Sequence, residues 1–154
     1  MGLDMYLEKR HYVQRWDHID PDKQFKVSIT RGDKPYDVIK YERVSYVIEQ
    51  VAYWRKANQI HHWFVENVQR GEDDCQPYYC SYEQLNELFS LVCDVLAEPA
   101  RAEELLPTES GFFFGGTDYD ESYMLDLTET RDMLAALFAE PGAEDADYYY
   151  SASW

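Results

Sequence analysis

Two short segments near the start of the chain have an apolar residue at every second position, which is the period of a half-buried β-strand. Turn-forming residues at 17–23 separate the segments, and a second turn at 31–37 follows them. We therefore expect two strands here. Their apolar positions are Leu3, Met5 and Leu7 in the first segment and Phe25, Val27 and Ile29 in the second.

The segment 44–69 contains no glycine or proline, yet its apolar positions do not fit one straight helix. Its two halves each place apolar residues on one helical face, and these faces are nearly opposite. The first face holds Val44, Val47, Ile48 and Val51, and the second holds Ala57, Ile60, Trp63, Phe64 and Val68. We expect a break or a strand-to-helix transition near 52–55, followed by a helix to about Gln69.

Apolar residues spaced three and four apart predict two further helices. One begins after Ser81, which forms a capping box with Gln84, and ends before Pro99. The other begins near Glu121 and ends before Pro141. The predicted buried residues are Leu85, Leu88, Phe89, Val92 and Leu96 in the first helix and Met124, Leu127, Leu134, Leu137 and Phe138 in the second.

Less regular segments complete the predicted fold. A short helical turn at 101–105 and a loop at 110–117 lie between the two helices, and the aromatic segment YYYSASW at 148–154 favours a closing strand. Together these elements predict an α+β fold. We expect one compact domain over residues 1–154, with a small antiparallel sheet and about three main helices.

The net charge of −16 is distributed unevenly along the chain. Residues 1–71 carry 12 Lys and Arg against 10 Asp and Glu, whereas residues 72–154 carry 2 against 20. Such an acidic segment repels phosphate backbones, so we expect no direct binding of nucleic acid. It attracts basic surfaces of other proteins instead. Solubility alone is the alternative explanation of the charge.

Cysteine use and hydropathy bear on the compartment. The odd set of three cysteines, together with a start that lacks an apolar leader, favours reduced thiols in a cytoplasm. No apolar run approaches the ~18–20 residues that a membrane span requires. We therefore expect a cytoplasmic protein with no membrane partner.

The densest group of polar and aromatic residues lies at 53–64. If this segment is helical, Arg55, Asn58 and His62 share one face, next to Trp54. Arginine holds anions, asparagine orients them and histidine moves protons. These four residues and the loop 112–117 therefore form a candidate pocket for a small anionic ligand such as a nucleotide. The alternative is a solvated helix face.

Metal-ligating residue types are present without a metal-binding pattern. The spacing of His61 and His62 from Cys75 and Cys80 matches no usual zinc framework. The acids of GGTDYDE at 115–121 offer oxygen ligands to a hard cation but lack the EF-hand pattern. Asp118 or Asp120 as the cap of the following helix is the alternative. We predict no metal and no cofactor.

Four blocks carry a resemblance to known proteins: MGLDMY at 1–6, YWRKANQIHHWFVENVQ at 53–69, SGFFFGGTDYDESY at 110–123 and YYYSASW at 148–154. Together they resemble an uncharacterised family of small proteins of bacteriophages and prophages. The resemblance implies an accessory phage protein that acts in the host cytoplasm. A compact, very acidic protein in that setting is similar to inhibitors of host defence, including anti-CRISPR and antirestriction proteins that imitate nucleic acid.

The leading hypothesis is a non-enzymatic interaction protein whose carboxylates stand in for phosphates. We expect Glu83 and Glu87 on one helix, and Glu129 and Asp132 on the last helix, to form one acidic face that docks on a basic host protein. The second hypothesis is the ligand pocket at Trp54, Arg55, Asn58 and His62. The third is a metal-dependent enzyme that uses Asp118, Asp120 and Glu121.

Overall fold

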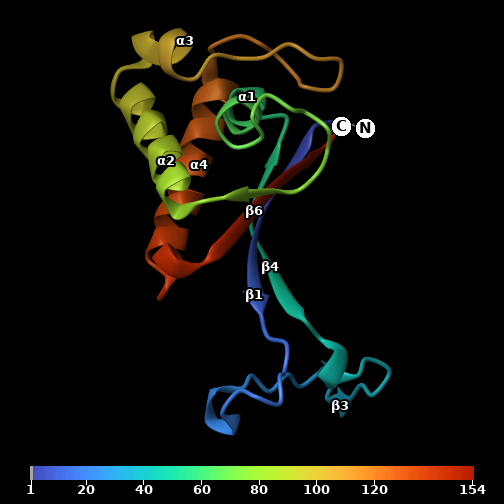
Figure 1. Ribbon diagram of the computed structural model, residues 1–154. Helices are drawn as coiled ribbons and strands as arrows, with labels where there is room; N and C mark the ends of the chain where they lie inside the picture. The colour runs from blue at the N-terminus through green and yellow to red at the C-terminus, as the bar shows by residue number, and fades with distance from the viewer. Residues whose placement is uncertain (1) are drawn as a thin grey trace. The chain divides into compact units, whose positions relative to one another are not determined.

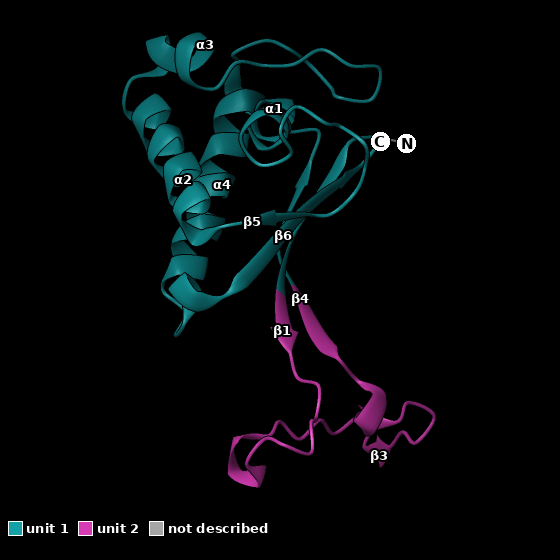
Figure 2. Cartoon of the chain, in the orientation of Figure 1, with its two compact units in different colours: residues 1–9, 50–154 teal, residues 10–49 magenta. Residues whose placement is uncertain are grey.

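The computed structural model describes residues 2–154 and divides into two compact units (Figure 2). Unit 1 contains residues 1–9 and 50–154, and unit 2 contains residues 10–49. The α+β fold class predicted from the sequence is confirmed. The assignment of residues 1–154 to a single domain stays a prediction.

A four-stranded antiparallel sheet forms the framework of unit 1 (Figure 1). Its order is β4 (Tyr46–Arg55), β1 (Asp4–Tyr12), β6 (Asp147–Ser153) and β5 (Tyr78–Cys80). The first predicted strand and the closing strand are both confirmed. Their inward side chains are fully buried, among them Leu3, Met5 and Leu7 in or next to β1 and Tyr148 and Tyr150 in β6.

Within residues 2–154 four helices accompany the sheet, and α2 packs against α4. They are α1 (Asn58–Asn67), α2 (Tyr82–Ala97), α3 (Ala102–Leu105) and α4 (Glu121–Phe138). The capping box of α2 is confirmed, because the Ser81 hydroxyl accepts from the Gln84 amide and the Gln84 side chain accepts from the Ser81 amide. Single 3-10 turns lie at Pro21–Lys23, Tyr41–Arg43, Pro99–Arg101 and Ala143–Asp145.

The transition from strand to helix is confirmed and lies slightly later than 52–55. β4 continues to Arg55, and α1 begins at Asn58. The two halves of this segment therefore belong to different elements, which explains why their apolar faces are out of phase. In α4 the buried stripe differs in part from the expected one: Tyr123 and Thr130 are fully buried or nearly so, whereas Met124 and Phe138 are half-buried.

Unit 2 contains little regular structure besides the ends of β1 and β4. Its own hairpin joins β2 (Thr30–Arg31) to β3 (Lys34–Pro35), in the turn predicted at 31–37. The strand predicted at 25–29 is wrong: none of these residues lies in a strand, and Phe25 is 62% exposed. Only the Ile29 carbonyl, next to β2, accepts a backbone hydrogen bond from the Tyr36 amide at 3.0 Å. Alternation places side chains on two sides, but a strand forms only where a neighbour pairs with it and a second layer covers one side.

In the described part of the chain, no helix combines the length and the hydropathy that crossing a membrane requires.

Candidate functional site

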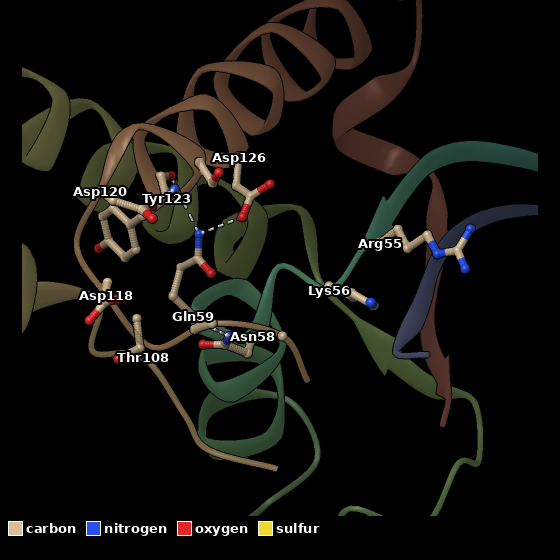
Figure 3. A pocket seen from close by; sticks show the side chains of 12 residues that line it. Arg55, Lys56, Asn58, Gln59, Thr108, Asp118, Asp120, Tyr123 and Asp126 are labelled. Atoms are coloured by element: carbon tan, nitrogen blue, oxygen red, sulfur yellow. Dashed lines mark hydrogen bonds between the residues drawn. The ribbon is translucent and has the colours of Figure 1, made fainter. Parts of the chain in front are cut away.

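A cavity of about 300 Å³ lies in unit 1, where the end of β4, the first turn of α1 and the segment 108–126 meet (Figure 3). Asp118 and Asp120 lie on one side of it, and Arg55 and Lys56 lie on the other, with their side chains extending away from Asn58 and Gln59. The cavity therefore has a cationic end and an acidic end.

Lys56 joins β4 to α1 in a left-handed backbone conformation, with φ of 60°. This conformation costs a non-glycine residue roughly 1–2 kcal/mol, and such residues persist only where their surroundings hold them. The Lys56 amide donates to the Leu3 carbonyl at 2.8 Å, and its carbonyl accepts from the Asn58 amide at 2.9 Å. Within residues 2–154 its ammonium group has no ion-pair partner.

A glycine of the neighbouring loop fits closely against Lys56. Gly115 has a φ of +86°, and a Cβ atom added to it would lie 3.2 Å from the Cβ of Lys56. Only glycine combines this φ with so close an approach at low cost. The loop and the strand-to-helix junction are thus fitted to each other at the mouth of the cavity.

Arg55 is held loosely at the same end. Its side chain is 61% exposed, and its Nε lies 3.9 Å from Oδ1 of Asp4. The same Asp4 oxygen accepts a hydrogen bond from the Tyr53 hydroxyl, which raises the pKa of Tyr53. Because Asp4 is shared between two partners, the guanidinium remains available to an anion.

Asn58 builds the floor of the cavity by binding backbone. Its side-chain amide donates to the carbonyls of Phe114 at 3.0 Å and Gly116 at 2.8 Å, and its oxygen accepts from the Glu109 amide at 2.9 Å. Both amide protons are therefore used within the protein. Asn58 lines the pocket as predicted, but its role in the structure is to fix the loop 109–116.

Gln59 and Asp126 line the cavity between its two ends, and neither was singled out in the sequence. The side-chain amide of Gln59 donates to Oδ2 of Asp126 at 3.2 Å. Burial raises the pKa of Asp126, against the opposing effect of this hydrogen bond. Gln59 follows Asn58 directly in the first turn of α1, but only the position of α4 shows that it faces Asp126.

The other two residues of the predicted pocket lie elsewhere. Trp54 is buried in the core, where its indole donates to the Thr130 hydroxyl at 2.8 Å. His62 lines a separate cavity of about 120 Å³ beside α3, with its Nδ1 3.2 Å from Oε2 of Glu109. The expectation of one helical face is thus wrong, because Arg55 belongs to a strand and precedes the helix.

The neighbouring histidine, His61, is fully buried and was not recognised as a core residue. Its two ring nitrogens share hydrogen bonds with the Tyr150 hydroxyl at 2.8 Å and with Oδ2 of Asp73 at 3.0 Å. Burial raises the pKa of Tyr150. The indole of Trp154 donates to the other oxygen of Asp73 at 3.1 Å. This network ties β6 and the loop after α1 to the core. The sequence did indicate burial of His61, because it lies four residues after Ala57 and three before Phe64, the spacing of one helical face.

The predicted acidic residues are exposed on two packed helices, outside the cavity. Glu83 and Glu87 lie on α2, and Glu129 and Asp132 lie on α4. Glu83 and Glu87 border a shallow hollow that Tyr82 and Leu91 also line. Asp132 is partly neutralised by Arg131, whose Nη2 lies 2.9 Å away. A single continuous acidic face stays a prediction.

One of the acidic residues proposed as metal ligands has a structural role. Asp120 caps α4, with its Oδ1 accepting from the Tyr123 amide at 3.1 Å. Among residues 2–154 no group of three or more His, Cys, Asp or Glu side chains is arranged to hold a metal ion. Cys75 is exposed, whereas Cys80 is buried and its pKa is raised to about 12 by that burial.

Comparison with protein-family models, curated proteins and solved structures gives no match for this chain.

Proposed function

We propose that the protein binds a small anionic ligand of the nucleotide type in the cavity at the junction of β4 and α1. The observation that carries the proposal is Lys56. Its backbone is held in a strained conformation by Leu3, Asn58 and the close approach of Gly115, and its ammonium group has no ion-pair partner among the described residues. Strained backbone concentrates at ligand sites.

The two ends of the cavity select the ligand's chemistry. Arg55 and Lys56 supply the cationic end, which suits a phosphate or a carboxylate. Asp118 and Asp120 supply acceptors at the other end, and Asp126 supplies a further acceptor between the two ends, which suits amino groups. A nucleotide with an amino-bearing base carries both groups, separated by its sugar.

The cavity's size limits the ligand further. Pockets for drug-sized ligands span roughly 300–1,000 Å³, and this cavity of about 300 Å³ lies at the lower end. A mononucleotide therefore fits the proposal better than a dinucleotide cofactor does.

Ligand-induced stabilisation tests this proposal. We expect AMP, more than adenosine or inorganic phosphate, to raise the melting temperature, because a ligand at 100 times its Kd stabilises the folded protein by about 2.7 kcal/mol. Arg55→Ala and Lys56→Gln should each raise the Kd measured by calorimetry at least tenfold, which is about 1.4 kcal/mol.

The matched control is Lys34→Gln in the exposed β2–β3 hairpin of unit 2, which should leave the Kd unchanged. Arg55→Ala should change the free energy of unfolding by less than about 0.5 kcal/mol, since the side chain is exposed. The absence of stabilisation by AMP, CMP and GMP at millimolar concentration would contradict a nucleotide site.

The second candidate function is the one that the sequence suggests, a phage-derived interaction protein. It would inhibit a host defence system by binding a host protein with a basic surface. Glu83 and Glu87 favour it, because both are exposed on α2 and have no ion-pair partner within residues 2–154.

Affinity capture from host lysate at low and high salt tests this candidate. Replacement of Glu83, Glu87, Glu129 and Asp132 by their amides should slow association and leave the fold intact. Retention of the partner by this variant at unchanged rates would refute it.

A further inference from the structure

Unit 2 exposes an unusual amount of apolar surface. It holds nine of the fifteen large hydrophobic side chains that are exposed in the described chain, although it comprises only residues 10–49. These nine are Tyr12, Trp16, Phe25, Val38, Ile39, Tyr41, Tyr46, Val47 and Ile48. Single exposed apolar residues need no explanation, but a concentration of them marks an interaction surface.

The same unit lacks a hydrophobic core. Among its described hydrophobic residues only Val13 is buried, and all the other buried hydrophobic residues belong to unit 1. Segments of about 40 residues usually require a disulfide, a metal or an association to remain folded. Unit 2 contains no cysteine, and none of its residues, all of which the structure describes, belongs to a group of three or more His, Cys, Asp or Glu side chains arranged to hold a metal ion. Of the three sources of stability, association is therefore the one that we consider.

The exposed area is sufficient for a stable interface. An aromatic side chain buries about 150–250 Å² when it is fully covered. The nine side chains are between 39% and 74% exposed. The five aromatic side chains among them therefore offer on the order of 400–600 Å², and the four valine and isoleucine side chains add to this area, toward the ~800 Å² per partner of a standard protein interface.

The distribution of charge permits a second copy of this chain as the occupant. Unit 1 contains 6 Lys and Arg against 23 Asp and Glu, whereas unit 2 contains 8 against 7. Two copies of this chain repel each other through unit 1, with its net charge of −17, but unit 2 has a net charge of only +1. Unit 2 is thus the part of the chain through which two copies can meet without the repulsion of a large net charge.

The backbone of β4 adds an open edge to this apolar surface. β4 is the outermost strand of the sheet, and its residues from Tyr46 to Gln50 are all exposed. A long apolar edge strand is a template for pairing with another strand. Antiparallel pairing of β4 with β4 of a second copy is symmetric, as the common two-fold contacts of homodimers are.

We propose that two copies of this chain associate through unit 2, with the exposed apolar side chains of residues 12–48 and the outer edge of β4 at residues 46–49 forming a two-fold symmetric interface. The proposal is independent of the ligand site, since every residue of that site lies in unit 1.

Sedimentation equilibrium of the full chain at micromolar concentration tests the proposal. We expect a species of twice 18.3 kDa. Ile48 is 51% exposed, and Ile48→Glu should raise the dimer Kd at least 100-fold. The monomeric variant should still unfold cooperatively in a thermal melt followed by circular dichroism. Ile48→Asn removes the apolar side chain without adding charge and should weaken the dimer by at least tenfold.

The matched control is Phe112→Glu, which adds the same charge at the most exposed of the large hydrophobic residues described in unit 1 and should leave the dimer Kd unchanged. Raising the salt concentration from 50 to 500 mM should tighten the dimer, because salt screens the repulsion between acidic units. A wild-type chain that is monomeric at 100 µM would overturn the proposal and leave unit 2 to a different protein. A dimer that Ile48→Glu does not weaken, or that Phe112→Glu breaks, would also overturn it.

Discussion

The two units use apolar residues in opposite ways. Unit 1 buries them: all of the fully buried hydrophobic side chains belong to it, and they form one core cluster. Unit 2 exposes them, and its polar residues are nearly balanced in charge. The difference shows that hydrophobic content alone does not indicate a core. Stability should reside in unit 1 and association in unit 2.

Truncation of an aromatic residue in each unit gives the largest expected contrast. Phe64 is fully buried and stacks on Tyr150 with 3.8 Å between ring centroids. Phe64→Ala should lower the free energy of unfolding by about 3–5 kcal/mol, because it removes buried surface and leaves a cavity. Phe25→Ala in unit 2 should change it by less than about 0.5 kcal/mol in the monomer. Urea denaturation measures both, and equal effects would break the comparison.

Glycine substitutions sharpen the same contrast at smaller magnitude. Gly115→Ala should lower the free energy of unfolding by about 2–3 kcal/mol, because alanine is strained at a φ of +86° and its Cβ would press on Lys56. Gly32→Ala in unit 2, at a φ of +55° with nothing within 4 Å of the added Cβ, should cost only about 1 kcal/mol.

Gly116 provides the control within the same loop, since an added Cβ there would also meet nothing within 4 Å. Thermal unfolding should rank Gly115→Ala as the least stable of the three variants. If Gly116→Ala destabilises the protein as much, the close approach to Lys56 is not the cause.

The smallest expected effect concerns the pH dependence of unit 1. Burial raises the pKa of Asp126 above its ordinary value of 3.8. The folded protein therefore binds this proton more tightly than the unfolded chain does. The stabilising contribution is complete below 3.8 and is lost as the pH rises through the raised folded pKa.

Asp126→Asn removes this titration while keeping an oxygen for the Gln59 hydrogen bond. The stability of the variant relative to wild type should increase slightly between pH 4 and pH 7, as measured by urea unfolding at each pH. Asp33→Asn in the hairpin of unit 2 is the corresponding exposed control. A relative stability that falls with rising pH would contradict the sign of the shift.

The elements of unit 1 could be predicted because local signals and packing agree there. Leu3, Met5 and Leu7 alternate and face the core, and Ser81 with Gln84 starts a helix in the predicted way. Phe25 belongs to an equally regular alternation that forms no strand. The alternation of apolar residues indicates which side of a strand would be buried. It does not indicate whether other residues cover that side.

The candidate site was predictable only in part for a related reason. Arg55 and Asn58 line the cavity as predicted. The prediction that His62 shares a helical face with them assumed a helix at Arg55, where β4 still continues, and His62 lines a separate cavity. Lys56 lies in the polar cluster at 53–64 but was not among the predicted pocket residues, because its importance depends on a left-handed backbone and on the approach of Gly115 from a distant segment. Neither property is encoded in the spacing of neighbouring residues.

The order of the strands also has a consequence for how the chain is made. β6, which ends at Ser153, lies between β1 and β5, so the first and last described strands are neighbours in the sheet. Synthesis at ~5–20 residues per second places roughly 10–30 s between the emergence of β1 and that of β6. Throughout that interval one edge of β1 has no partner and is open to foreign strands. The nascent chain therefore completes the sheet of unit 1 only after synthesis of that unit has ended.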